Sequence, residues 1–408
     1  MTNQRTRGPV TGIIFKVHGR EGNEMASRQA ELAGQIARAH GARAAWLVRA
    51  TCPLDLLAKL GIIGPEDHLV AFTAACEGSV PDALKWGSVS VVDDSAPEAF
   101  LAQSGWGDPD YLARFSTCSD DGLAKAGSPA SYAFGSGLSS ARLFWFVDML
   151  GAPGVPVPDI RALSCAARSV GALLIVDCSR ATSFACKPLA LGAQICLEAV
   201  GGGGACCSSA VLEKTYAVCL APAVSGRGRR RVVHTEAEDA YRLFAFRLGD
   251  PAEDPTSAMR LGEDELSRIA SVLATLPAAM QQRMDSARAI AAYLSCHPCI
   301  GYVWYPGLAS HADHAVATIT LEHGFGPVVD FCLTGAPLAS CEGRARRLIE
   351  LYDGIRPNAA DGRPMSAVTC IKAGNQAYLR VYAGLDDPLA VTDSLDQALR
   401  LFCNPPQP

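Results

Sequence analysis

The chain alternates short apolar runs with segments of helical periodicity. Residues 25–40 place small and apolar side chains at helical spacing with charged residues between them, and Gly41 follows as a stop signal, which predicts an N-terminal helix. A second helix is expected at about Leu54 to Leu60. Runs typical of strands are Ala44 to Val48, His68 to Thr73, Val89 to Val92, Leu143 to Val147, Leu173 to Asp177 and Ile195 to Leu197. Strands separated by helical connections predict a mostly parallel sheet with helices on both faces.

The second half of the chain predicts a separate, smaller α/β region. A long helix spans about Glu263 to Ala292 and leads into it. Its expected strands are Ile300 to Trp304, Ala315 to Leu321, Val328 to Leu333 and Tyr378 to Tyr382, and Leu395 to Leu401 forms a last amphipathic helix. We therefore divide the chain into an N-terminal arm and helix (1–45), a large domain (46–260) and a C-terminal small domain (261–408).

Composition narrows the classes of protein that fit. With 408 residues, of which 49% are hydrophobic, the chain can form substantial cores. A net charge of −5 argues against general attraction to nucleic acid or acidic membranes. No uncharged apolar stretch approaches the roughly 18 residues of a membrane span. The segment Met1-Thr2-Asn3-Gln4-Arg5 leads into charged, helical sequence with no apolar signal core, so we expect a cytoplasmic protein.

The sixteen cysteines are scattered through strand and helix patterns and do not form the dense framework of a small secreted domain. Cys296-His297-Pro298-Cys299 has a spacing seen in redox and metal sites, but it lacks a second pair at zinc-finger distance. Cys206 and Cys207 would be nucleophiles or ligands only beside a base or cation. We interpret these cysteines as structural thiols and predict no metal ligands.

Two polar features stand out from the apolar pattern. The run Leu173 to Asp177 is apolar on both faces and ends in a carboxylate, as a central parallel strand does where its carboxyl end lines a ligand site. The basic run 225–231 could bind phosphate, but a solvated loop is the simpler interpretation in an acidic chain.

Several segments resemble the Cys/Met-metabolism family of pyridoxal-phosphate (PLP) enzymes, which contains cystathionine gamma-synthase, cystathionine beta-lyase and methionine gamma-lyase. The resemblance rests on four segments in the family's order: 171–182, Pro188 to Ala193, Tyr305 to His311, and Leu379 to Asp387. It covers about residues 15 to 401. The implied fold is α/β, of the aspartate-aminotransferase-like fold-type I PLP transferase class, with a large domain and a smaller C-terminal α/β domain. The implied assembly is a homodimer, or a tetramer of two dimers, in which an N-terminal arm reaches the neighbouring subunit.

Three positions keep residues that the family uses. Asp177 matches the aspartate that faces the pyridine nitrogen and keeps the ring protonated, although a strand-end Asp can also serve only as a cap. Arg20 matches the arginine of an arm motif that grips the cofactor phosphate, but the tyrosine of that motif is His18 here. Arg380 matches the arginine that receives the substrate carboxylate; a structural ion pair is the alternative.

Other family positions have changed. The family's Schiff-base lysine aligns with Gly202, within the run Gly201 to Gly204, and the neighbouring lysines Lys187 and Lys214 lie at the wrong ends of the segment. The tyrosine that stacks on the ring aligns with Cys76. An asparagine that touches the ring hydroxyl aligns with Ala152.

The phosphate loop of the family corresponds to Thr51 and Cys52, followed by Pro53. Because backbone amides at a helix start can bind an anion whatever the side chain, an anion cradle is still expected there. The substrate loop before the last arginine is altered, at residues 359–365.

These residues leave three hypotheses open. The first is a lysine-less homologue without Schiff-base catalysis, which keeps an anion or amino-acid site or acts as a partner subunit beside an active paralogue. The second is an enzyme that binds PLP, without a covalent link, for altered chemistry. The third is a conventional carbon-sulfur lyase or gamma-synthase acting on a cysteine, homocysteine or homoserine derivative, with Lys187 or Lys214 as the amine. Whether the chain is an enzyme is left open.

Overall fold

The computed structural model describes residues 20–72, 88–92, 94–104, 142–200, 213–225, 232–233, 235–248, 260–335, 342–355, 365–373 and 376–403. The strands of its larger sheet are β1 (Ala44–Ala50), β2 (His68–Phe72), β3 (Ser88–Val91), β4 (Leu143–Asp148), β5 (Leu173–Asp177), β6 (Ile195–Val200) and β7 (Lys214–Leu220). Their order is β1-β7-β6-β5-β4-β2-β3, and β7 runs antiparallel to the other six strands. The prediction of a mostly parallel sheet is confirmed.

Helices cover both faces of this sheet, because alternate residues of each strand point to opposite sides. On one face, Phe144 and Phe146 pack with the helices α2 (Pro53–Lys59) and α7 (Thr235–Leu248). On the other face, Trp145 and Val147 pack with α3 (Pro97–Gln103) and α5 (Ile160–Ser169), while α1 (Arg20–His40) covers β1 and β7. Short helical turns, α6 (Thr182–Ala185) and a 3-10 turn η2 (Pro188–Leu191), connect β5 to β6. A two-stranded ribbon pairs β8 (Val224–Ser225) with β9 (Val232–Val233).

A smaller antiparallel sheet forms a second core. It contains β10 (Ile300–Trp304), β11 (Val328–Leu333), β12 (Ala367–Ala373) and β13 (Gln376–Tyr382), in the order β10-β11-β13-β12. The helices α10 (Glu342–Ile355) and α11 (Pro388–Cys403) pack on this sheet and on each other.

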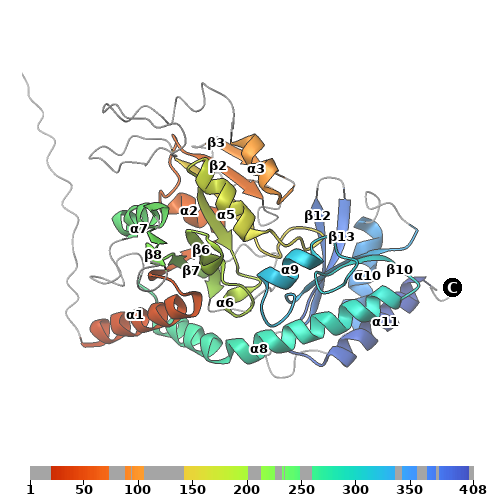
Figure 1. Ribbon diagram of the computed structural model, residues 1–408. Coiled ribbons are helices and arrows are strands. Elements are labelled where there is room, and N and C mark those ends of the chain that lie inside the picture. The colour runs from red at the N-terminus through yellow and green to blue at the C-terminus, as the bar shows by residue number, and fades with distance from the viewer. Residues whose placement is uncertain are drawn as a thin grey trace, which may run out of the picture.

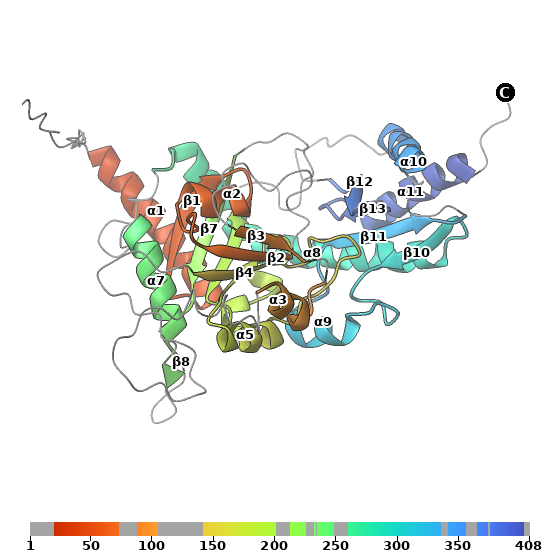
Figure 2. The ribbon, with the colours of Figure 1, turned by 90° about the horizontal axis from the view of Figure 1, so that it is seen from above.

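The helix α8 (Glu263–Cys296) joins the two cores (Figures 1 and 2). Its 34 residues correspond to about 50 Å of helix. Leu266 and Ile269, in its first turns, pack with α1, whereas Ile290 and Leu294 belong to the core of the small sheet. The domain boundary placed at residue 261 stays a prediction. No helix in the described ranges is long and apolar enough to cross a membrane.

One predicted strand is wrong. Residues 315–321 were expected to be extended, but α9 (His314–Thr320) is a helix. Ala317 and Thr320, three residues apart, are buried, while Ile319 is exposed, which is helical spacing. The β-branched residues of this segment favour strands only weakly, so tertiary packing decides: the His314 ring stacks on Phe325 beside the helix start.

The segment 296–299 also differs from the expectation of buried thiols. Cys296 is exposed, and Cys299 forms a disulfide with Cys403 at the end of α11. The bond ties the turn between α8 and β10 to the end of the last helix.

Candidate functional site

Two buried carboxylates lie side by side at the carboxyl ends of β4 and β5. Asp148 and Asp177 are Cα partners in the parallel register, and they are 0% and 2% exposed. Both end apolar strands, and the carboxyl ends of parallel strands meet at one edge of a sheet, where ligands usually bind in this class of fold. Asp177 therefore lies at the ligand edge of the sheet, as its strand predicted. Asp148, a second carboxylate, lies beside it and was not selected from the sequence.

The environment of Asp177 favours its protonated form. Burial, and then the charge of Asp148, raise the pKa of Asp177 to about 7. Hydrogen bonds oppose this shift: Ser179 donates its backbone N–H (2.9 Å) and its hydroxyl (2.5 Å) to Oδ1 of Asp177. The Ser179 hydroxyl also accepts the N–H of Ala199 on β6 (2.9 Å). Ser179 thus holds the carboxylate in place relative to both strands.

Arg180 is the cation of this site. Its Nη1 donates to both oxygens of Asp148 at 3.0 Å, and its guanidinium also has a side-chain hydrogen bond with Tyr382 of the small sheet. Burial raises the pKa of Asp148, while Arg180 and then Arg380 oppose the rise. Asp148 needs a neighbour without a side chain, because a Cβ on Gly151 would lie 1.8 Å from its Oδ2.

Tyr216 on β7 faces the same group. It is 4% exposed, and burial followed by the charge of Asp177 raises the pKa of its phenol. The sequence offered no sign of Tyr216, because it sits inside an ordinary strand pattern. Asp148 could have been found by the reasoning used for Asp177, since it too ends an apolar run.

Thr51 and Cys52 directly precede α2, and the donors of Thr51 are used within the chain. The backbone N–H of Thr51 (2.9 Å) and its hydroxyl (2.8 Å) both donate to Oδ2 of Asp55, and Cys52 accepts the N–H of Asp55 (3.4 Å). Burial acts to raise the pKa of Asp55, but hydrogen bonds from Thr51 and from Lys59 outweigh it, so the pKa is lowered. An ionised carboxylate therefore occupies the place where the sequence predicted an anion cradle.

Arg380 is likewise bound inside the protein. It lies on β13, 1% exposed, and its Nε and Nη2 donate to the two oxygens of Asp330 at 2.7 and 2.8 Å. Its Nη1 and Nη2 also donate to the carbonyl oxygens of Gly151 (2.5 Å) and Ala152 (2.8 Å). Asp330 is fully buried and accepts the N–H of Gly154 (2.8 Å) as well. The guanidinium of Arg380 thus joins the small sheet to the loop after β4. Binding of a substrate carboxylate by Arg380 stays a prediction.

The other predicted positions are only partly described. Arg20 is the first residue of α1, but its side chain lies outside the described residues. Also outside are His18, Cys76, the run Gly201 to Gly204 with Gly202, Cys206, Cys207, the basic run from residue 226 to residue 231, and residues 359–364.

The two alternative lysines are both described. Lys187 pairs with Glu322 (2.9 Å). Lys214 is exposed and begins β7, where it is the Cα partner of Ala50. It lies two residues before Tyr216, so the two side chains leave the same face of the strand.

Comparison with known proteins gives a consistent result. A family model described as Cys/Met metabolism PLP-dependent enzyme matches residues 267–350. The chain is 28% identical over 204 residues to O-acetyl-L-homoserine sulfhydrylase 1 of Thermus thermophilus, covering 47% of each. It is 30% identical over 259 residues to O-succinylhomoserine sulfhydrylase of Pseudomonas aeruginosa, covering 61% of this chain and 57% of that protein. The chain spans about half the length of the curated relatives it matches.

Solved structures show the same fold. Apo CalE6, a methionine gamma lyase from Micromonospora echinospora, superposes with a TM-score of 0.64 at 22% identity, covering 91% of this chain and 86% of the other. MetB from Corynebacterium glutamicum gives a TM-score of 0.62 at 19% identity, covering 90% and 84%. The aspartate-aminotransferase-like architecture expected from the sequence is confirmed by these superpositions.

Proposed function

We propose that this chain, which resembles the Cys/Met metabolism family of PLP-dependent enzymes, is a member without Schiff-base catalysis that serves as a partner subunit for a catalytic relative. The observation that carries the proposal is the internal use of the family's anion-binding groups. Arg380 donates to both oxygens of Asp330 and to two carbonyl oxygens, and Thr51 is bound to Asp55. The glycine at position 202 supports it from the sequence, since no amine is available there.

The described residues do not fit the family's cofactor at its phosphate end. A phosphate placed against Thr51 would meet the ionised carboxylate of Asp55, which already accepts both Thr51 donors. Two like unit charges about 4 Å apart repel by about 4 kcal/mol at an effective dielectric constant of 20. Where the pyridine ring of PLP would lie, Asp177 keeps the family's residue type. This contact alone, without a phosphate site, does not hold PLP. We therefore assign no reaction step to PLP in this chain.

The partner role follows from what the fold retains. The resemblance places the family's sites between subunits and brings an N-terminal arm to the neighbouring chain. A chain that has lost its own amine while keeping this scaffold can still contribute surface, and Arg20, to a neighbour. Such a neighbour would act on substrates of the kind named in this chain's relatives. These relatives include an O-acetylhomoserine sulfhydrylase and an O-succinylhomoserine sulfhydrylase.

Spectroscopy tests the loss of Schiff-base chemistry. The full chain is purified alone, its absorption is recorded with and without added PLP, and the mixture is then reduced with borohydride and mapped by peptide mass spectrometry. We expect no aldimine band at stoichiometric PLP and no lysine labelled at high occupancy. Labelling at Lys187 or Lys214 that disappears when that lysine alone is replaced by alanine would show a conventional enzyme instead. Retained PLP without a label would favour the altered-chemistry enzyme.

Native mass spectrometry tests the partner role separately. The tagged chain is isolated from cells that express it at its natural level. We expect heteromers with a lysine-containing member of the same family. Recovery of this chain only as a homodimer or a monomer would refute the partner role without bearing on the spectroscopic result.

A further inference from the structure

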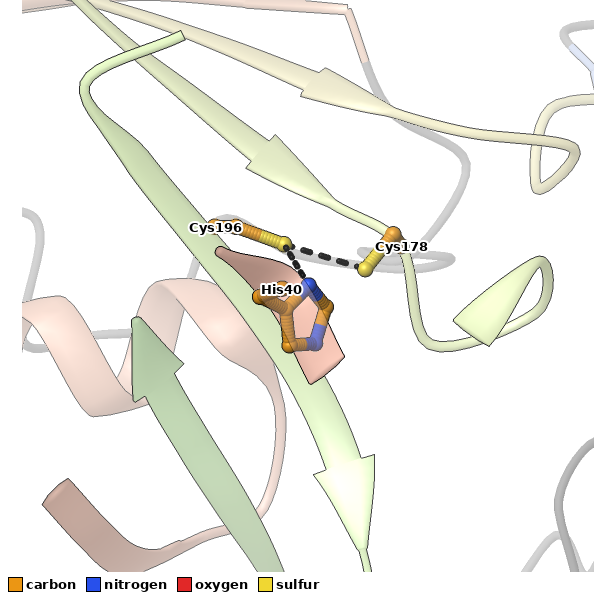
Figure 3. Close-up of side chains that lie close together, drawn as sticks. All are labelled: His40, Cys178 and Cys196. Atoms are coloured by element: carbon orange, nitrogen blue, oxygen red, sulfur yellow. Dashed lines mark hydrogen bonds between the residues drawn. The ribbon is translucent and has the colours of Figure 1, made fainter. Parts of the chain in front are cut away.

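Three potential metal ligands converge on the sheet face opposite Tyr216. His40 ends α1, Cys178 follows β5, and Cys196 lies on β6 (Figure 3). The two Sγ atoms are 3.0 Å apart, Cys196 Sγ is 3.7 Å from Nδ1 of His40, and all three ligand atoms lie within 4.8 Å of one another. His40 is 1% exposed and both cysteines are 0% exposed. The sequence analysis predicted no metal ligands, and it did not connect these residues.

The orientation of His40 is fixed by a buried carboxylate. Nε2 of His40 lies 2.6 Å from Oε2 of Glu198, and the same oxygen accepts the N–H of Ser183 (2.9 Å). In the neutral tautomer whose Nε2 donates to this carboxylate, Nδ1 keeps its lone pair. Nδ1 lies on the side of the ring that faces Cys196, as Figure 3 shows. A carboxylate that holds a histidine in this way is the usual second contact of a metal-binding histidine.

We propose that His40, Cys178 and Cys196 bind a thiolate-preferring divalent cation, with Zn²⁺ as the best match. Tetrahedral Zn²⁺ with bonds of about 2.3 Å to sulfur and 2.0 Å to nitrogen sets its ligands about 3.5–3.8 Å apart. The observed separations, 3.0 and 3.7 Å with none above 4.8 Å, reach this triangle with shifts under about 1 Å. The fourth ligand would be a water or Cys219, the buried Cα partner of Cys196 on β7.

Charge favours a divalent ion over a monovalent ion at these two thiols. Both thiols are fully buried and lie away from solvent. A divalent ion that displaces the two protons forms a neutral unit with the two thiolates and the neutral imidazole, and a dry core tolerates a neutral unit best. Since Cys178 directly follows Asp177, the ion would tie the end of α1 to the strand edge that carries the candidate site.

Metal analysis of the full chain tests the proposal. The protein is purified under reducing conditions without chelator and analysed by inductively coupled plasma mass spectrometry. It is then stripped and titrated with Co²⁺, which reports thiolate ligation by charge-transfer absorption, and Zn²⁺ is added in competition. We expect one ion per chain and a cobalt-thiolate band that Zn²⁺ removes. Cys178→Ser and Cys196→Ser should abolish both signals.

The controls separate this site from the other cysteines and from misfolding. Cys186→Ser changes an equally buried thiol outside the cluster and should leave the stoichiometry and the band unchanged. Glu198→Gln keeps all three ligands and should weaken Co²⁺ binding by about 10- to 100-fold, measurable even where a cysteine variant fails to fold. The proposal is overturned by a reduced, folded chain that gives no thiolate band, by a band that persists in both cysteine variants, or by a Cys178–Cys196 disulfide in the isolated protein.

Discussion

Arg380 offers the sharpest test, because its two candidate roles predict different measurements. If the guanidinium is structural, Arg380→Met leaves Asp330 fully buried, charged and without its partner, and leaves two carbonyl oxygens without their donor. Breaking a buried ion pair in this way costs about 3–5 kcal/mol. If Arg380 instead serves a substrate carboxylate, its loss should weaken ligand binding and leave the stability almost unchanged.

A double-mutant cycle measures the interaction energy between Arg380 and Asp330. We expect Arg380→Met and Asp330→Asn each to lower the free energy of unfolding by about 3–5 kcal/mol. The double variant should recover most of one loss, because no charge remains unpaired and the amide oxygen can still accept from Gly154. Arg400→Met, which breaks an exposed ion pair with Asp396, is the matched control and should cost less than about 1 kcal/mol.

The assay is urea unfolding of the wild type and the four variants, followed by far-ultraviolet circular dichroism and analysed by linear extrapolation. Isothermal titration with amino acids that resemble the relatives' substrates is run in parallel. The structural interpretation fails if Arg380→Met costs under about 1 kcal/mol, or if the two single losses simply add. It also fails if the wild type binds an amino acid and Arg380→Met alone removes that binding.

Three further outcomes are expected around the site. Asp177 has a folded-state pKa of about 7 against an ordinary value of 3.8, so the native state keeps its proton over the range where the unfolded chain has lost it. Stability should therefore fall as the pH rises from about 4 to 7, by up to about 4 kcal/mol, and chemical denaturation of Asp177→Asn across that range should show a flatter profile. Asp55→Ala should free the donors of Thr51, so that inorganic phosphate raises the melting temperature of the variant and not of the wild type; equal shifts would contradict this. Gly151→Ala should cost about 1–3 kcal/mol in urea unfolding, because its new Cβ meets the carboxylate of Asp148, and an unchanged midpoint would count against that contact.

The metal proposal and the partner proposal depend on different parts of the molecule. Cys178 and Cys196 lie on the face covered by α1, whereas the loss of Schiff-base chemistry is argued from Gly202, Thr51 and Arg380. Failure of one would leave the other standing. Success of both would describe a family member that has kept its scaffold, uses an ion to hold it, and lacks the amine of its relatives.

The sequence alone determined the fold class and one residue of the candidate site, Asp177. Strands such as Leu173 to Asp177, buried on both faces, must be apolar throughout, so their pattern is legible without coordinates. A carboxylate at such a strand end marks the ligand edge of a parallel sheet, and the same logic applies to Asp148. Periodicity failed at α9, where β-branched residues are held in a helix by packing.

Only the tertiary structure decided what the polar side chains do. Arg380 and Asp330 are 50 residues apart in the chain, and no spacing shows that each is the other's partner. His40 and Cys196 are 156 residues apart and become neighbours only when α1 packs across the sheet. The physical reason is that apolar patterning is a local property of a segment, whereas the partner of a buried charge or thiol is chosen by the assembly of segments distant in sequence.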